Sequence, residues 1–125
     1  MILDTDAVSG ILAGDSELES ILLSAQRHEL PVVVVGEYQF GLIGSRKRAR
    51  LQSLFDRLVS ESVLLDIDGE TARQYATIRY QLKAKGRPIP ENDIWIAALA
   101  RQHDLVVVSR DPHFDAVDGI GRQSW

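Results

Sequence analysis

The chain has 125 residues, of which 45% are hydrophobic, 26% are charged and none is cysteine. This composition is typical of one globular domain, and the lack of cysteine excludes disulfides, thiolate zinc sites and cysteine nucleophiles. A net charge of −4 argues against a general nucleic-acid coat protein, so any nucleic-acid partner would need a local basic patch or metal ions. No apolar run approaches the roughly 20 residues that span a bilayer, and no signal peptide is recognisable. We therefore expect a cytoplasmic protein with no membrane partner.

Short apolar runs predict the strands. Four runs contain fewer than eight residues and are rich in Val, Ile or Leu, which is typical of strands buried on both faces. In chain order they are Met1–Leu3, Val32–Val35, Val63–Leu65 and Leu105–Val108. A weaker fifth strand is expected at Ile120–Ser124.

The segments between these runs have the apolar spacing of helices. Stripes at residues 18–25, 51–59 and 72–82 predict amphipathic helices, and residues 94–100 predict a helix buried against the sheet. Strands that alternate with helices imply βαβ crossovers and a parallel sheet. We predict a single α/β domain over residues 1–125, with three α/β/α layers and a mostly parallel central sheet of about five strands.

Acidic residues follow the predicted strands. Asp4 follows the first strand, Glu37 the second and Asp111 the fourth, while Asp93 opens the apolar helix. Taken singly, each acid is explained by helix capping or by the helix dipole. In a parallel sheet, however, the carboxyl ends of the strands lie at one edge, where ligands bind. We therefore expect the four acids to converge there.

Such a cluster points to a metal ion. Two carboxylates about 5 Å apart repel by roughly 3 kcal/mol at an effective dielectric constant near 20, which a protein tolerates when protons or cations lie among them. Oxygen ligands suit Mg²⁺ or Mn²⁺ better than Zn²⁺. A metal held by carboxylates indicates phosphate chemistry, because it can activate water, orient a phosphate and stabilise the leaving oxygen.

Four segments that span nearly the whole chain resemble the motifs of a known family. They are Met1–Asp6, Val35–Gly41, Ile89–Ala98 and Val108–Phe114, and the third is the most specific. Through them the sequence resembles a PIN-domain ribonuclease, specifically a VapC-type toxin of bacterial or archaeal toxin–antitoxin systems.

This resemblance implies an activity and a set of partners. The activity is that of a Mg²⁺- or Mn²⁺-dependent endoribonuclease of a type II system, which cuts tRNA or ribosomal RNA with a metal-activated water. The acidic quartet would be Asp4, Glu37, Asp93 and Asp111, with Asp4 and Asp93 as the main metal ligands. Such toxins are usually homodimers that a cognate antitoxin silences.

Other residues are candidates for supporting roles. By family analogy, Thr5 and Ser109 would assist near the metal or the phosphate. Asp115 lies one helical turn beyond Asp111 and could replace or assist it. His113 lies beside the predicted site, whereas the three histidines as a group show no paired spacing and are interpreted as surface or hydrogen-bonded residues.

One dense basic run, Arg46–Arg50, has two interpretations. It is either a contact for the RNA backbone or the solvated face of an amphipathic helix. The candidate RNA-binding residues are Arg46, Lys47, Arg48 and Arg50.

Three other functions compete with a nuclease. Asp4–Val8 fits the nucleophile motif of haloacid-dehalogenase-like phosphatases, although Glu37 and Asp93 would then have no role. A phosphoacceptor receiver domain would need a lysine where Ser109–Asp111 stands. A catalytically inactive PIN-type module would bind RNA or protein without cutting.

Overall fold

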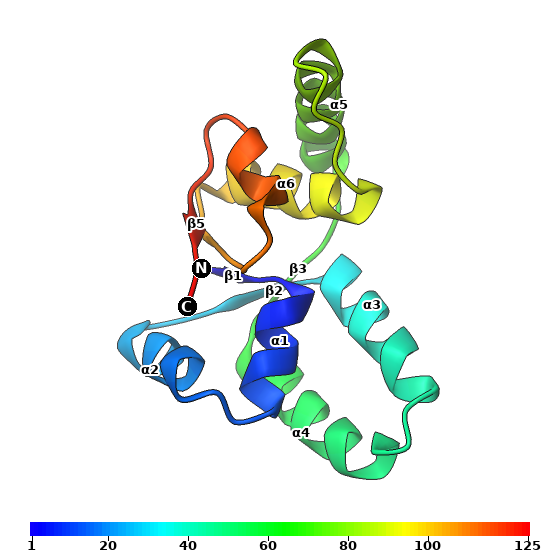
Figure 1. Ribbon diagram of the computed structural model, residues 1–125, viewed down its shortest axis with the longest axis vertical. Helices are drawn as coiled ribbons and strands as arrows, with labels where there is room; N and C mark the ends of the chain where they lie inside the picture. The colour runs from blue at the N-terminus through cyan, green and yellow to red at the C-terminus, as the bar shows by residue number, and fades with distance from the viewer.

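A computed structural model describes residues 1–125 and contains one five-stranded sheet (Figure 1). All four strand pairs are parallel, and the strand order is β3-β2-β1-β4-β5. The strands are β1 (Ile2–Leu3), β2 (Glu29–Pro31), β3 (Val63–Leu65), β4 (Val107–Val108) and β5 (Arg122–Gln123). The predicted parallel sheet of about five strands is confirmed.

Six α-helices and one 3₁₀ helix connect the strands. They are α1 (Thr5–Leu12), α2 (Ser16–Ser24), α3 (Val32–Ile43), α4 (Arg48–Glu61), α5 (Gly69–Ala84), α6 (Glu91–His103) and η1 (Pro112–Ala116). In Figure 1, α1, α2 and α4 lie on one side of the strands, and α5 and α6 lie on the other. This arrangement confirms the three-layer α/β/α class. None of the helices combines the length and the apolar character that crossing a bilayer requires.

The prediction of a strand at Val32–Val35 is wrong. The strand β2 ends at Pro31, and the four valines form the first turn of α3. Valine lowers helix propensity only by a few tenths of a kcal/mol, whereas full burial of a side chain such as Val34 contributes roughly 1.5–3 kcal/mol. Tertiary burial therefore overrides the local β preference, because a short apolar run fits a buried strand and a buried helix equally well.

The helix α6 is the central packing element, as its sequence predicts. Ile94 and residues 96–100 are all buried. The helix α6 packs against α5, on the side of the sheet opposite α1 (Figure 1). Its first turn stays at the surface, since Glu91 and Asn92 are exposed. A rigid, buried helix thus presents its N-terminus next to the carboxyl ends of the strands.

The strand order places a topological switch point at the centre of the sheet. The strand β1 pairs with β2 on one side and with β4 on the other. From β1 the sheet extends through β2 to β3 on one side and through β4 to β5 on the other, so the order of the strands reverses at β1. Open parallel sheets bind ligands outside the carboxyl ends of the strands at such a point. Asp4 follows β1 and Ser109 follows β4, so both residues stand at this position.

Candidate active site

Asp4 lies at the end of β1 and caps α1. Its Oδ1 accepts a hydrogen bond from the Thr5 backbone N–H at 2.7 Å, and its Oδ2 accepts one from the Ser109 hydroxyl at 2.8 Å. Both Asp4 and Ser109 are buried. These two bonds set the orientation of the carboxylate, so Ser109 joins the end of β4 to the end of β1.

Glu37 reaches the same place from a different element than predicted. It lies in the second turn of α3, not directly after a strand. Its Oε2 accepts a hydrogen bond from the Thr5 hydroxyl at 2.6 Å. Thr5 therefore connects α1 to α3 and holds the Glu37 carboxylate beside Asp4.

Asp93 and Asp111 complete the group. Asp93 stands in the first turn of α6, and Asp111 caps η1 by accepting the His113 backbone N–H at 2.9 Å. All four predicted acids line one depression of about 340 Å³, together with Thr5, Asp6 and Ser9. An adjoining depression of about 460 Å³ shares Glu37, Asp93 and Asp111. Neither has a hydrophobic residue in its lining.

Two of these carboxyl groups are electrostatically unfavourable when ionised. The pKa of Asp4 is raised from 3.8 to about 6, mainly by burial and to a smaller extent by the charges of Asp6 and Asp93, while its hydrogen bonds from Ser109 and Thr5 act in the opposite direction. Burial also raises the pKa of Asp93, as do the charges of Asp111 and Glu37, while its hydrogen bond with His113 lowers it. A cation among these oxygens would remove the repulsion.

The comparisons with known proteins agree with this geometry. A family model described as the PIN domain matches residues 1–120. The chain belongs to the PIN-domain family. Among curated relatives, ribonuclease VapC5 of Mycobacterium tuberculosis is 31% identical over 122 residues, which cover 94% of this chain and 87% of the relative. The tRNA(fMet)-specific endonuclease VapC of Shigella flexneri is 30% identical over 94 residues, which cover 74% of this chain and 71% of the relative.

Solved structures show the same PIN fold. DNA-bound VapBC from Salmonella typhimurium matches with a TM-score of 0.89 and 26% identity, covering 99% of this chain and 96% of that one. VapBC-5 from Mycobacterium tuberculosis, a member of a family of toxin–antitoxin systems, matches with a TM-score of 0.76 and 29% identity, covering 98% and 94%.

The structure distinguishes Asp111 from Asp115, which the sequence left as alternative candidates for the fourth acid of the site. Asp115 forms a bidentate ion pair with Arg122, with both N–O distances at 2.8 Å. It does not line either acidic depression of this PIN domain. Asp111 is therefore the acid of this segment that faces the other three.

The sequence did not predict a role for Asp6 in the acidic site. In the structure, Asp6 holds the loop after β4 through a hydrogen bond. Its Oδ2 accepts a hydrogen bond from the Arg110 backbone N–H at 2.9 Å, and its Oδ1 is buried without a hydrogen-bond partner. The Ser109 hydroxyl in turn accepts the Asp111 backbone N–H at 2.9 Å. The Asp-x-Asp spacing at the end of β1 is the signal that could have suggested this contact, because Asp4 caps α1 and Asp6 stands in its first turn.

The basic run lies apart from the acids. Lys47 precedes α4, Arg48 and Arg50 stand in its first turn, and Arg46 belongs to the preceding connection. All four side chains are exposed, and none lines the acidic depressions. The geometry therefore leaves these residues available to solvent or to a partner.

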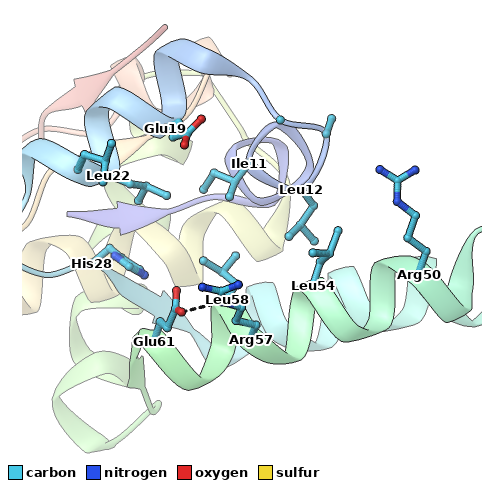
Figure 2. Close-up of a pocket in the computed structure, with 13 residues that line it drawn as sticks. Ile11, Leu12, Glu19, Leu22, His28, Arg50, Leu54, Arg57, Leu58 and Glu61 are labelled. Carbon is cyan, nitrogen blue, oxygen red and sulfur yellow. Dashed lines mark hydrogen bonds and ion pairs between the residues drawn. The ribbon is translucent and has the colours of Figure 1, made fainter.

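The largest cavity of the domain, about 600 Å³, is a groove between α1, α2 and α4 (Figure 2). Its floor is apolar, and Figure 2 shows Leu12 of α1 and Leu54 and Leu58 of α4 pointing into the space between the two helices. Charged residues surround this floor, namely Glu19, Arg50, Arg57 and Glu61. The groove lacks the clustered carboxylates of the acidic site, so it suits a ligand with an apolar face.

Proposed function

We propose that this PIN-domain protein is the toxin of a type II toxin–antitoxin system and acts as a metal-dependent endoribonuclease on RNA phosphodiester bonds. The observation that carries this proposal is the convergence of four acids from four separate segments in a depression with no apolar lining. The names of relatives such as ribonuclease VapC5 support the same activity. We expect the protein to act in the cytoplasm, where tRNA and ribosomal RNA are its candidate targets.

The donor set fits Mg²⁺ or Mn²⁺. Asp4, Glu37, Asp93 and Asp111 offer hard oxygen ligands, and burial and mutual repulsion disfavour the ionised forms of Asp4 and Asp93 when no cation is present. We assign Asp4 and Asp93 as the main metal carboxylates. Glu37 and Asp111 would complete the shell through waters or help to hold a second ion. A divalent cation, when bound there, would activate a water and stabilise the leaving oxygen.

The remaining residues would orient the acids and the substrate. Thr5 and Ser109 hold the Glu37 and Asp4 carboxylates through hydrogen bonds of 2.6 and 2.8 Å. The N-terminus of α6 carries a partial positive charge that favours an anionic phosphate nearby. Attack of water on phosphorus would leave a 5′-phosphate and a 3′-hydroxyl. Products with a 2′,3′-cyclic phosphate would contradict this mechanism.

Arg46, Lys47, Arg48 and Arg50 are our candidate contacts for the RNA backbone. Their exposed cations form no ion pair with an acid of the chain, and they add a local positive charge to an acidic protein. Such contacts increase affinity without reading the sequence of the RNA.

We also propose that a cognate antitoxin occupies the groove of Figure 2. The apolar floor and charged rim fit one face of an amphipathic helix. Solved relatives such as VapBC-5 belong to toxin–antitoxin systems.

A second copy of the chain would cover Phe40 on α3. This side chain is 81% exposed, and Ile43 on the same helix is 60% exposed. The two side chains are three residues apart on the same helix and are therefore neighbours on its surface, and adjacent exposed apolar side chains are typical of association surfaces. Sedimentation of Phe40→Asp tests this homodimer, and the expected result is a shift toward the monomer. A variant that sediments like the wild type would contradict it.

The competing functions lack support from the geometry. A phosphatase that uses Asp4 as its nucleophile leaves Glu37 and Asp93 without a role, although both line the same depression as Asp4. A receiver domain would need a lysine near Asp4, whereas the segment after β4 supplies Ser109, Arg110 and Asp111. An inactive PIN module would bind RNA without cleaving it, which the following experiment would reveal.

The experiment is cleavage of a total tRNA and ribosomal RNA pool with Mn²⁺ by the wild type and by Asp93→Asn. The substitution keeps the shape of the side chain and removes its charge. Asp115→Asn is the matched control, because Asp115 is paired with Arg122 outside the depression. Discrete cuts by the wild type and the control, but not by Asp93→Asn, would support the proposal. Equal cutting by all three proteins would contradict the assigned site.

A further inference from the structure

His113 stands in the acidic site and is not part of the proposed acidic quartet. Its Nδ1 lies 3.0 Å from Asp93 Oδ2 and 3.0 Å from Asp111 Oδ1. One ligand atom from each of these three side chains lies within 4.8 Å of the other two. The imidazole therefore bridges two carboxylates that we have assigned to a metal site.

The local backbone fixes this position. Asp111 caps η1 and accepts the His113 backbone N–H at 2.9 Å, and Pro112 restricts the backbone between them. This tight turn brings the ring back over the carboxylate of Asp111. Asp93 approaches from the first turn of the buried helix α6, so the two acids and the ring are held by two separate elements.

The same geometry suits two states of the ring. Without a cation, an Nδ1–H group would donate to the nearby carboxylate oxygens, which act as acceptors. With a cation, the Nε2–H tautomer would offer the Nδ1 lone pair to the ion, and Nε2 would face water because the side chain is 43% exposed. Adjacent ligand atoms around an octahedral ion with bonds of about 2.1 Å lie roughly 3.0 Å apart, so the ring needs little movement to act as a ligand.

We propose that Nδ1 of His113 is a direct ligand of the divalent cation assigned above to the acidic site, where it lies beside the main ligand Asp93 and beside Asp111, and that it makes the site prefer Mn²⁺ over Mg²⁺. This inference rests on the metal-dependent function proposed above and specifies the ion. Mg²⁺ takes oxygen ligands almost exclusively, whereas first-row transition ions accept an imidazole nitrogen. The four acids can still hold Mg²⁺ with water in the place of the ring.

Mn²⁺ binding followed by electron paramagnetic resonance tests this ligand directly. The full chain is stripped with EDTA and titrated with Mn²⁺, and pulsed spectra report nitrogen coupled to the ion. His113→Ala removes the ring, whereas His113→Asn keeps an amide near the Nδ1 position that can still donate to the two acids. His103→Asn is the matched control, because His103 is an exposed histidine at the other end of α6.

The expected result is nitrogen coupling in the wild type and in His103→Asn, and none in either His113 variant. Mn²⁺ affinity should fall roughly 10- to 100-fold in both His113 variants, while Mg²⁺ affinity, measured by competition, changes less than about threefold. Labelling the wild type with ¹⁵N-histidine should change the coupling frequencies.

Three results would overturn the inference. If the wild type binds Mn²⁺ without nitrogen coupling, the ring is not a ligand, but the proposed metal-dependent function stands. If His113→Asn keeps the wild-type Mn²⁺ affinity and ion preference, the ring only positions Asp93 and Asp111. If the wild type binds no Mn²⁺, this inference fails, and if it binds no Mg²⁺ either, the proposed metal-dependent function fails with it.

Discussion

The acidic depression and the apolar groove contribute to the stability of the fold in opposite ways. The groove shares Leu12 and Leu58 with the main hydrophobic cluster, where they are 9% and 5% exposed, so its floor helps to hold the fold together. The depression is lined by polar and charged side chains, and burial of Asp4 without a cation opposes folding. Substitutions should therefore cost stability in the groove, whereas in the depression they should cost activity and can even stabilise the metal-free protein.

The largest effect is expected from Asp111→Asn, which changes the acidic depression without touching the core. Cleavage should fall roughly 10²- to 10³-fold, the range for loss of one preorganised polar group at a reacting centre, while the melting temperature stays the same or rises. Asp115→Asn is the control and should cleave like the wild type. Initial rates with Mn²⁺ and thermal melts measure both quantities. If Asp115→Asn is the inactive variant, the assignment of the fourth acid is wrong.

The second prediction concerns the groove, where we expect a loss of stability without a loss of activity. Leu58→Ala removes a buried side chain from α4 and should lower the free energy of unfolding by about 2–4 kcal/mol, because a cavity remains in the core. Cleavage per folded molecule should be unchanged at low temperature. Urea denaturation measures the loss, and Leu54→Ala, which alters a side chain 37% exposed in the same groove, should cost less. A loss for Leu58→Ala no larger than that for Leu54→Ala would contradict the inference that Leu58 joins the groove to the core.

The third prediction concerns pH and Asp4. Its pKa is about 6 in the folded protein and ordinarily 3.8, so the folded state binds this proton more tightly than the unfolded state. The contribution of Asp4 to stability is complete below about pH 4 and disappears as the pH rises through 6. In EDTA at pH 8, Asp4→Asn should therefore be more stable than the wild type, by up to about 3 kcal/mol.

Metal ions sharpen this test. Adding Mn²⁺ at pH 8 should stabilise the wild type more than Asp4→Asn and narrow or reverse the difference, because a ligand that binds only the folded state raises stability. Thermal melts between pH 4 and 8, with and without Mn²⁺, follow both effects. Parallel pH profiles of the two proteins in EDTA would show that Asp4 is not the source of the pH dependence.

The smallest effect is expected from the basic run Arg46–Arg50. Arg50 lines the groove, and the other residues of the run line neither the groove nor the acidic depression. Replacing Arg46, Lys47 and Arg48 by Ala in the Asp93→Asn background should weaken RNA binding and reduce the slope of log affinity against log salt by up to about 2. Filter binding at several salt concentrations measures the slope. Replacing Arg73 and Arg79 of α5 by Ala is a control for loss of positive charge elsewhere on the surface. An unchanged slope in the triple variant would leave the run as a solvated helix face.

Much of the fold follows from the sequence, because long periodic patterns depend on local spacing. The apolar stretch 94–100 predicts a buried helix, and α6 is that helix. The alternation of strands and helices predicts the parallel sheet, and the parallel sheet explains why acids after β1 and β4 meet. These inferences need only the period of the side chains and the common direction of the strands.

Tertiary structure decided what short patterns leave open. Val32–Val35 is helical because burial of Val34 outweighs β propensity, and Glu37 consequently reaches the depression from α3. Asp111 faces the site and Asp115 does not because Arg122, seven residues beyond Asp115, binds the latter. The contact of His113 with Asp93 joins residues 20 positions apart on two elements. A side chain's partners depend on distances through space, which the turn at Pro112 and the packing of α6 determine and local sequence spacing does not.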